Sequence, residues 1–333
     1  MPGTAGNRKP DFGVSDVEPQ MFKSPLNVEF GQTQLSATEL AKFSGTIKPG
    51  YQVIFGPAVT LNLGITDLSR TQVASLLTGA YVTWDQVGAA IDTPVVVCRR
   101  VQGSGTQASF NQYFLNFPCA ANNIAQSGNL SPTRMSDSAG FGVGGTGASS
   151  GDPILIDPSL GPTTVENPAS GDVRSCLIAA QNGADHSFKG DDGKFYKVQF
   201  SKPGGPYGAI GVLSLDSKGN TGYGAQWTFS KLNGIDPQVQ TNSQVGLYDF
   251  VLENTFQRKN DKVYPSGNYL SLINLFIAKS QSEAILRAIA NANVRASVLA
   301  VPNGTNPTPN PGTNITSKWT RNTNSCKPAQ FVF

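Results

Sequence analysis

The sequence predicts an α/β fold in two lobes, with mostly parallel sheets flanked by helices. First, apolar runs typical of strands alternate with helical periodicity along most of the chain. Second, 333 residues of which 38% are hydrophobic can bury a core large enough for two lobes. Third, residues 94–117 have the pattern of a buried strand, a tight Gly-Ser-Gly turn and a helix.

The other elements follow from periodicity and capping signals. Ser36 with Glu39 three residues later is typical of a helix start, and residues 67–69 precede another helical pattern. We expect helices at 36–43, 67–77, 84–90, 106–117, 171–181 and 269–292, strands at 52–63, 94–98, 207–213 and 248–256, and a polar hairpin around 191–193. The apolar face of the longest helix, 269–292, is expected in the core.

We assign residues 1–63 and 243–301 to lobe one and residues 64–242 to lobe two. Residues 302–333 are rich in Pro, Asn and Thr and are expected to form an extended tail. Residues 127–169 are rich in Gly, Ser and Pro. The glycine run at 141–147 lacks the Gly-Lys-Ser/Thr ending of a phosphate loop, which favours a flexible loop.

Composition excludes several classes of function. Charged residues make up 14% of the chain, the net charge is +3, and Lys/Arg runs are absent, so nucleic acid is not an expected partner. The sequence has no apolar run long enough for a transmembrane helix. A neutral polar surface favours a periplasmic or extracellular protein. Residues 1–10 lack the apolar core of a signal peptide, so residue 1 would not be the natural start if the protein is exported.

Four cysteines, Cys98, Cys119, Cys176 and Cys326, allow two disulfides in three connectivities. Cys119 and Cys326 lie in loop-like contexts and are the better candidates, and Cys326 would then hold the tail. Cys98 ends an apolar strand, where it can serve as a small buried hydrophobic residue. The single histidine, His186, lies in a polar segment and is predicted to be a solvated loop residue without a catalytic or zinc-binding role.

The turn at residues 99–106 is the strongest candidate site. Unpaired N–H groups and the positive end of the helix dipole lie at a helix start. Together with the hydroxyls of Ser104 and Thr106 and the guanidinium of Arg100, they would form a cradle for a tetrahedral oxyanion. The alternative is an ordinary strand-to-helix turn with Ser104 or Thr106 as the cap.

Five collinear segments resemble the phosphate-specific periplasmic binding proteins of the PstS type. They are residues 11–16 (DFGVSD), 77–85 (LTGAYVTWD), 99–106 (RRVQGSGT), 170–172 (SGD) and 208–211 (GAIG). The resemblance spans roughly residues 11–290. It implies a type II periplasmic binding fold, with the anion held in the cleft between two lobes.

The resemblance also implies roles for individual residues. Asp16 would accept a hydrogen bond from a protonated phosphate oxygen, which sulfate cannot offer. Arg100 would supply the opposite charge, and the segment Ser104, Gly105 and Thr106 would donate hydroxyl and N–H bonds. Asp172 belongs to the matched segment before the next helix. The alternative for Asp16 is a turn or cap residue.

Two departures from the family pattern stand out. Gln102 occupies the position of a carboxylate that pairs with the ligand arginine in the family; its amide can still hydrogen-bond Arg100 but carries no charge. The first strand, ligand loop and helix of the family, which precede the segment at 11–16, are missing, so lobe one is expected to be incomplete at its N-terminus. The sequence is then a fragment, or an exposed sheet edge pairs with another chain.

Three functions compete. The first is capture of phosphate or a related oxyanion for delivery to an inner-membrane ABC transporter. The second is a secreted structural or adhesive protein, a matrix or filament subunit, whose sheet a strand from a neighbouring chain would complete. The third, a phosphate-ester hydrolase, is disfavoured because Ser104 has no base within its motif and His186 is remote in sequence. We therefore expect a protein without enzyme activity and without a cofactor or metal.

Overall fold

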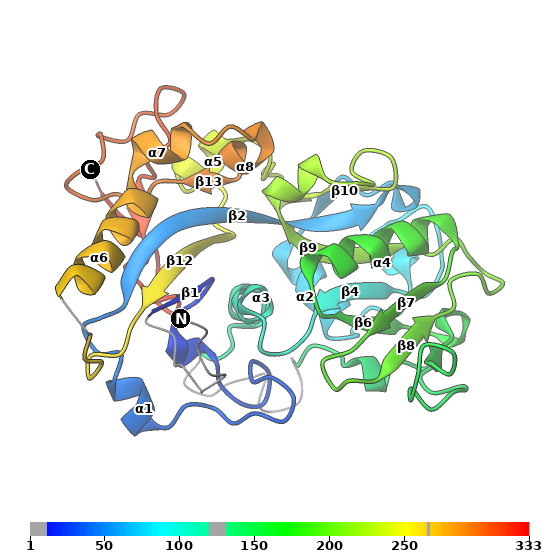
Figure 1. Cartoon of the computed structure of the whole chain (residues 1–333). Helices are drawn as coiled ribbons and strands as arrows, with labels where there is room; N and C mark the ends of the chain where they lie inside the picture. Colours follow the sequence, from blue (N-terminus) through cyan, green and yellow to red (C-terminus); the bar gives the residue numbers. More distant parts are fainter. Residues whose placement is uncertain (1–11, 120–130, 265–266, 333) are drawn as a thin grey trace.

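The computed structural model describes residues 12–119, 131–264 and 267–332. At its centre is a sheet with strand order β1-β12-β2-β9-β4-β6, in which β10 and β13 also pair with β2. These strands are β1 (Gly13–Ser15), β2 (Lys48–Thr60), β4 (Val96–Arg100), β6 (Thr163–Asn167), β9 (Ala209–Ser214), β10 (Trp227–Phe229), β12 (Val251–Gln257) and β13 (Val298–Leu299). Helices flank this sheet, which confirms the predicted α/β class (Figure 1).

Strand β2 connects the two halves of the molecule. Its first half pairs with β12 and β13, and its second half pairs with β9 and β10. Figure 1 shows β2 crossing from the part that carries β12 and α6 to the part that carries β9 and α4. The lobe boundaries proposed from the sequence stay a prediction, with β2 shared between the two parts.

The pairing of the strands is mixed, whereas mostly parallel sheets were expected. Strand β4 runs parallel to β6 and β9, because helical crossovers connect consecutive strands there. The partners of β2 all run antiparallel to it, as does β1 to β12. The antiparallel part of the sheet consists of strands that run in the opposite direction alongside the long strand β2.

Smaller sheets complete the strand set. They are formed by β5 (Ile154–Ile156) with β8 (Phe195–Val198) and β7 (His186–Lys189), by β3 (Asp67–Leu68) with β11 (Lys231–Leu232), and by β14 (Trp319–Thr320) with β15 (Gln330–Phe331). The predicted hairpin around 191–193 is confirmed as the turn between β7 and β8.

The helices are α1 (Ala37–Ala41), α2 (Arg70–Leu77), α3 (Gly105–Leu115), α4 (Ser170–Asn182), α5 (Gln240–Gln244), α6 (Gly267–Gln281), α7 (Glu283–Arg287) and α8 (Ala292–Ala296). The predicted helix starts at Ser36 and Ser69 are confirmed, each with a capping box. The expected helix at 84–90 is a short 3-10 turn, Trp84–Val87. In the described part of the chain, no helix combines the length and apolarity that crossing a membrane requires.

Helix α3 lies between the two parts of the molecule (Figure 1). On one side it packs toward β12, where the Tyr113 and Phe250 rings stack with centroids 4.6 Å apart. On the other side it follows β4 and contacts α2, where the Arg70 guanidinium lies 4.4 Å from the Tyr113 ring centroid. The last turn of α3 is thereby held at the junction of the two parts.

Two disulfides stabilise the fold. Cys119 and Cys326 both form a disulfide, as predicted, and the structure pairs them with each other, a connectivity that the sequence left open. The bond attaches the tail next to the end of α3. Cys98 is buried but not unpaired, because it is bonded to Cys176 and joins β4 to α4. The tail is held further by the Glu18 carboxylate, which accepts hydrogen bonds from the Ser325 N–H (2.6 Å) and hydroxyl (2.7 Å).

The prediction for His186 is wrong. Its side chain is buried at the start of β7, stacks on Phe188, and its Nε2 lies 3.1 Å from the Asn167 Oδ1. Burial lowers the pKa of His186 to about 4. The polar sequence around it misled the prediction, because alternate residues of β7 face the core.

The prediction of one long core helix at 269–292 is also wrong. Ser282 has an extended backbone and separates α6 from α7. In α6 only Ile273 is buried, whereas the apolar side chains of Leu272 and Leu275 are exposed. The helix has apolar residues on more than one face, and a single face packs against β2 and the Phe256 ring.

Candidate functional site

The turn between β4 and α3 has the predicted form. Gly103 has φ +85°, and a Cβ there would lie 2.6 Å from the Glu29 Cβ, so only glycine fits. Ser104 is the N-cap of α3, and its Oγ accepts a hydrogen bond from the Gln107 N–H at 3.4 Å. The cap residue is thus Ser104 rather than Thr106. The Thr106 hydroxyl is available for another partner.

That partner is Asp16, which follows β1. The Thr106 hydroxyl donates to the Asp16 Oδ2 at 2.9 Å. A Cβ on Gly105 would lie 3.0 Å from the Asp16 Cβ, so the glycine allows the carboxylate to approach the helix start. Burial raises the pKa of Asp16, while the Thr106 hydroxyl and the Arg100 charge act in the opposite direction. The carboxyl group therefore holds a proton more readily than an exposed aspartate.

The backbone on either side of Asp16 is fixed by β12. Ser15 pairs with Thr255 in the register of β1 and β12. The Thr255 hydroxyl (3.1 Å) and the Gln257 side-chain amide (2.8 Å) both donate to the Val17 carbonyl oxygen. These contacts place the Asp16 carboxylate at the start of α3 through the sheet of the other part of the molecule.

Arg100 ends β4 and turns toward the start of α4. Its Nη1 donates to the Ser170 hydroxyl at 3.2 Å and its Nη2 to the Pro168 carbonyl oxygen at 2.7 Å. The buried Nε has no hydrogen-bond partner in the described part of the chain. Burial lowers the pKa of Arg100, and the Asp16, Asp191 and Asp172 charges oppose that shift. The guanidinium thus lies in the electrostatic field of Asp16 without bonding to Ser104 or Thr106.

The structure places the two remaining predicted site residues elsewhere. The Gln102 Nε2 donates to the Pro25 carbonyl oxygen at 3.1 Å and not to Arg100. The Asp172 carboxylate accepts the Ala169 N–H at 3.0 Å and thereby caps α4. Asp16, Ser104, Gly105 and Thr106 are therefore brought together at the start of α3, with Arg100 nearby. Ser170, which orients Arg100, lies in the matched segment 170–172, but the sequence alone indicated no role for it.

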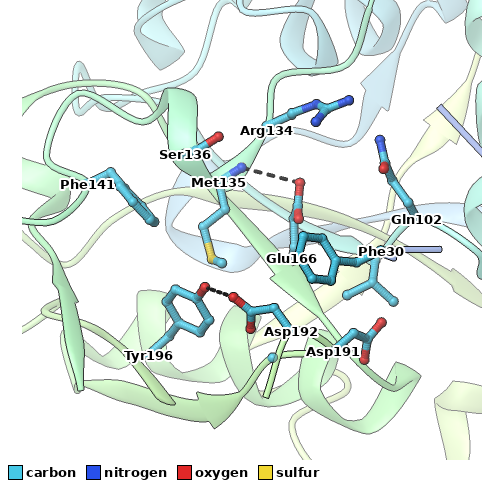
Figure 2. Close-up of a pocket in the computed structure, with 12 residues that line it drawn as sticks. Phe30, Gln102, Arg134, Met135, Ser136, Phe141, Glu166, Asp191, Asp192 and Tyr196 are labelled. Carbon is cyan, nitrogen blue, oxygen red and sulfur yellow. Dashed lines mark hydrogen bonds between the residues drawn. The ribbon is translucent and has the colours of Figure 1, made fainter. Parts of the chain in front are cut away.

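An open cavity of about 240 Å³ lies beside this turn (Figure 2). Its lining comprises Phe30, Val101, Gln102, Arg134, Met135, Ser136, Phe141, Glu166, Gly190, Asp191, Asp192 and Tyr196. Sequence reasoning missed this cavity, since residues 191–193 indicated only a hairpin turn. Asp191 and Asp192 were the available signal, but nothing in the sequence placed them next to the turn after β4.

No family model and no curated protein matches this chain. Solved structures of phosphate-binding proteins resemble it along most of its length. One is an ABC-type phosphate transport receptor from Vibrio cholerae, with a TM-score of 0.41 and 14% identity over 80% of this chain and 73% of that one.

Two further similar structures are PstS from Borrelia burgdorferi and a phosphate-binding protein from Stenotrophomonas maltophilia. The first has a TM-score of 0.40 and 12% identity, covering 88% of this chain and 80% of that one. The second has a TM-score of 0.44 and 15% identity, covering 83% and 71%. TM-scores below 0.5 indicate only a partial similarity of the backbones. The evidence for the candidate site is therefore the set of contacts within this chain.

Proposed function

We propose that this chain is a solute-binding protein that captures phosphate or a related oxyanion at the start of α3. One observation carries the proposal: a buried carboxyl group with a raised pKa, Asp16, is held against the helix start by the Thr106 hydroxyl. The N–H groups of the first turn and the helix dipole favour a bound anion there. Arg100 supplies positive charge on the side of β4.

The same geometry supports selectivity for a protonated anion. Hydrogen phosphate has an O–H that can donate to the Asp16 carboxylate, whereas sulfate has none at neutral pH. Sulfate would meet Asp16 as a second negative charge, and this repulsion discriminates against it. The Asp16 carboxylate would accept a hydrogen bond from the phosphate O–H, and the Thr106 hydroxyl would be free to donate to the anion instead.

The proposal includes an exported protein that works outside the cytoplasm. Two disulfides, one joining β4 to α4 and one holding the tail, are typical of oxidising compartments. In the same proposal, the protein delivers the anion to a membrane ABC transporter. Its role is to bind the anion and not to catalyse a reaction. The alternative of a matrix or filament subunit gains no support from any contact of the described residues.

Calorimetric titration with inorganic phosphate tests the proposal. We expect exothermic binding to the unmodified protein and its loss in Arg100→Ala, because the site then lacks its cation. Arg258→Ala is the matched control, since the Arg258 side chain has no described contact with the site, and binding should persist. Asp16→Asn should lower the ratio of the affinity for phosphate to the affinity for sulfate. Absence of phosphate binding, or equal binding in Arg100→Ala, would contradict the proposal.

A further inference from the structure

The cavity beside the β7–β8 hairpin holds three carboxylates, of which two already have partners. Glu166 forms an ion pair with the buried Arg99. Asp192 accepts hydrogen bonds from the Tyr196 hydroxyl at 2.6 Å and from the Lys194 N–H at 3.1 Å. Asp191 accepts no hydrogen bond from any described residue and forms no ion pair with one. Its negative charge therefore remains available at the cavity.

The charges around Asp191 are mostly of the same sign. Asp191 is exposed, but partial desolvation at the cavity raises its pKa, and the charges of Glu29, Asp192 and Glu166 raise it further, while Arg100 lowers it. Arg134 is the one cation in the lining, but in Figure 2 its guanidinium points away from Tyr196 and Asp192. A positively charged guest would relieve this repulsion, whereas an anion would add to it.

Aromatic rings and a methionine side chain form much of the cavity wall. The Phe141 and Tyr196 rings lie with centroids 6.4 Å apart, and the Met135 side chain extends toward Tyr196 (Figure 2). Phe30 lines the cavity from the N-terminal segment, and its side chain is 72% exposed, so the protein leaves most of this side chain uncovered. Aromatic faces next to a carboxylate attract ammonium groups, by cation–π interaction and by charge.

A bare metal ion fits this arrangement less well. Within residues 12–119, 131–264 and 267–332, no three acidic, His or Cys side chains converge as metal ligands. The carboxylates are instead distributed around a volume of about 240 Å³. This geometry suits a guest with its positive charge on a larger, partly apolar body.

We propose that this cavity binds a small alkylammonium cation. Asp191 is its charge partner, and the rings of Phe30, Phe141 and Tyr196 pack around its alkyl groups. The cavity adjoins the proposed oxyanion site, and the Arg100 charge acts on Asp191, but neither Arg100 nor Thr106 lines the cavity. Binding of a cation there does not require that the chain bind phosphate.

Titration of the whole chain with choline and with n-butylammonium tests this inference. The matched control ligand is 3,3-dimethylbutan-1-ol, which has the shape of choline without its charge. We expect at least one of the two cations to bind and the neutral alcohol to bind at least about tenfold more weakly. Asp191→Asn should weaken cation binding about tenfold. The control Asp92→Asn, at an exposed aspartate outside the lining, should leave it unchanged.

Phe141→Leu removes an aromatic wall and should also weaken binding of the cation. Four outcomes would overturn the inference. The first three are no binding of either cation, choline binding no tighter than its neutral analogue, and equal loss in Asp191→Asn and Asp92→Asn. The fourth is calcium binding that is tighter than choline binding and displaces choline, which would show a metal site. Phosphate titrated in parallel reports on the other proposal alone.

Discussion

Helix α3 is more buried than helix α6, although α6 has the more apolar sequence. Helix α6 carries Leu, Ile and Phe along its length, yet only Ile273 is buried. Helix α3 carries Gln107, Ser109 and Asn111, and all three are buried with its aromatic residues. The Asn111 side-chain amide donates to the Asn27 Oδ1 at 2.8 Å, so the polar groups are paired.

The comparison shows that burial here follows position rather than hydrophobicity. Helix α3 lies at the junction of the two parts and receives Asp16 from one part and Arg100 from the other. Helix α6 lies at the outside, against β2 (Figure 1). The polar helix therefore holds the candidate site, and the more apolar helix covers one end of the sheet.

The largest expected effect comes from truncating aromatic packing in α3. The Phe114 ring contacts the rings of Phe110, Tyr113 and Phe250. Phe114→Ala should lower the free energy of unfolding by about 3–5 kcal/mol, because it leaves a cavity between the two parts. Leu275→Ala in α6, at a residue 54% exposed, should change it by no more than about 0.5 kcal/mol.

Urea unfolding monitored by circular dichroism measures both values. Similar losses for the two variants would show that α6 is buried in solution, by another part of the chain or by a partner. The comparison between the helices would then fail.

A second prediction concerns His186, another polar side chain that the fold buries. Its pKa is about 4 in the folded chain and about 6.5 when unfolded. Because the unfolded chain binds the proton more tightly, stability is full above pH 6.5 and decreases as the pH falls toward 4. The loss should approach about 3 kcal/mol.

His186→Gln removes this titration and keeps a side chain able to bond Asn167. The difference between the two proteins, measured by urea unfolding at pH 7 and at pH 4.5, isolates the histidine from the carboxyl groups common to both. A constant difference across that range would show that His186 is exposed in solution.

The smallest expected effect concerns helix capping. Ser104→Ala removes the acceptor for the Gln107 N–H and should cost about 1 kcal/mol of stability. Ser280→Ala in α6 removes only a hydroxyl that donates to the Phe276 carbonyl oxygen, and little loss is expected. Thermal unfolding of both variants measures the two losses of stability. Equal shifts in Tm would show that the Ser104 cap contributes no more than the Ser280 hydroxyl.

The sequence predicted those features that local chemistry determines. The caps at Ser36 and Ser69 and the Gly-Ser-Gly turn before α3 were predicted and are present. Cys119 and Cys326 were predicted to be disulfide cysteines, and the structure adds that they are bonded to each other. The collinear motifs also predicted that Asp16 and Thr106 belong to one site, and the structure joins them at 2.9 Å.

Features that depend on long-range packing were not predictable in this way. Periodicity showed that α6 is apolar but not how much of its surface other elements cover. The burial of His186 depends on Asn167 of the neighbouring β6, and the Arg100 contacts depend on the start of α4. The cavity depends on residues from loops and strands that are far apart in the sequence, and no local pattern shows that they come together.

The central claim is that an oxyanion binds at the first turn of α3. Amide chemical shifts of the isotopically labelled chain, followed by NMR during a phosphate titration, test it most directly. The account predicts that the Gly105 and Thr106 amide resonances move most, and that these shifts vanish in Arg100→Ala. Saturating phosphate that leaves both resonances in place, or that moves only resonances of exposed lysines, would contradict it.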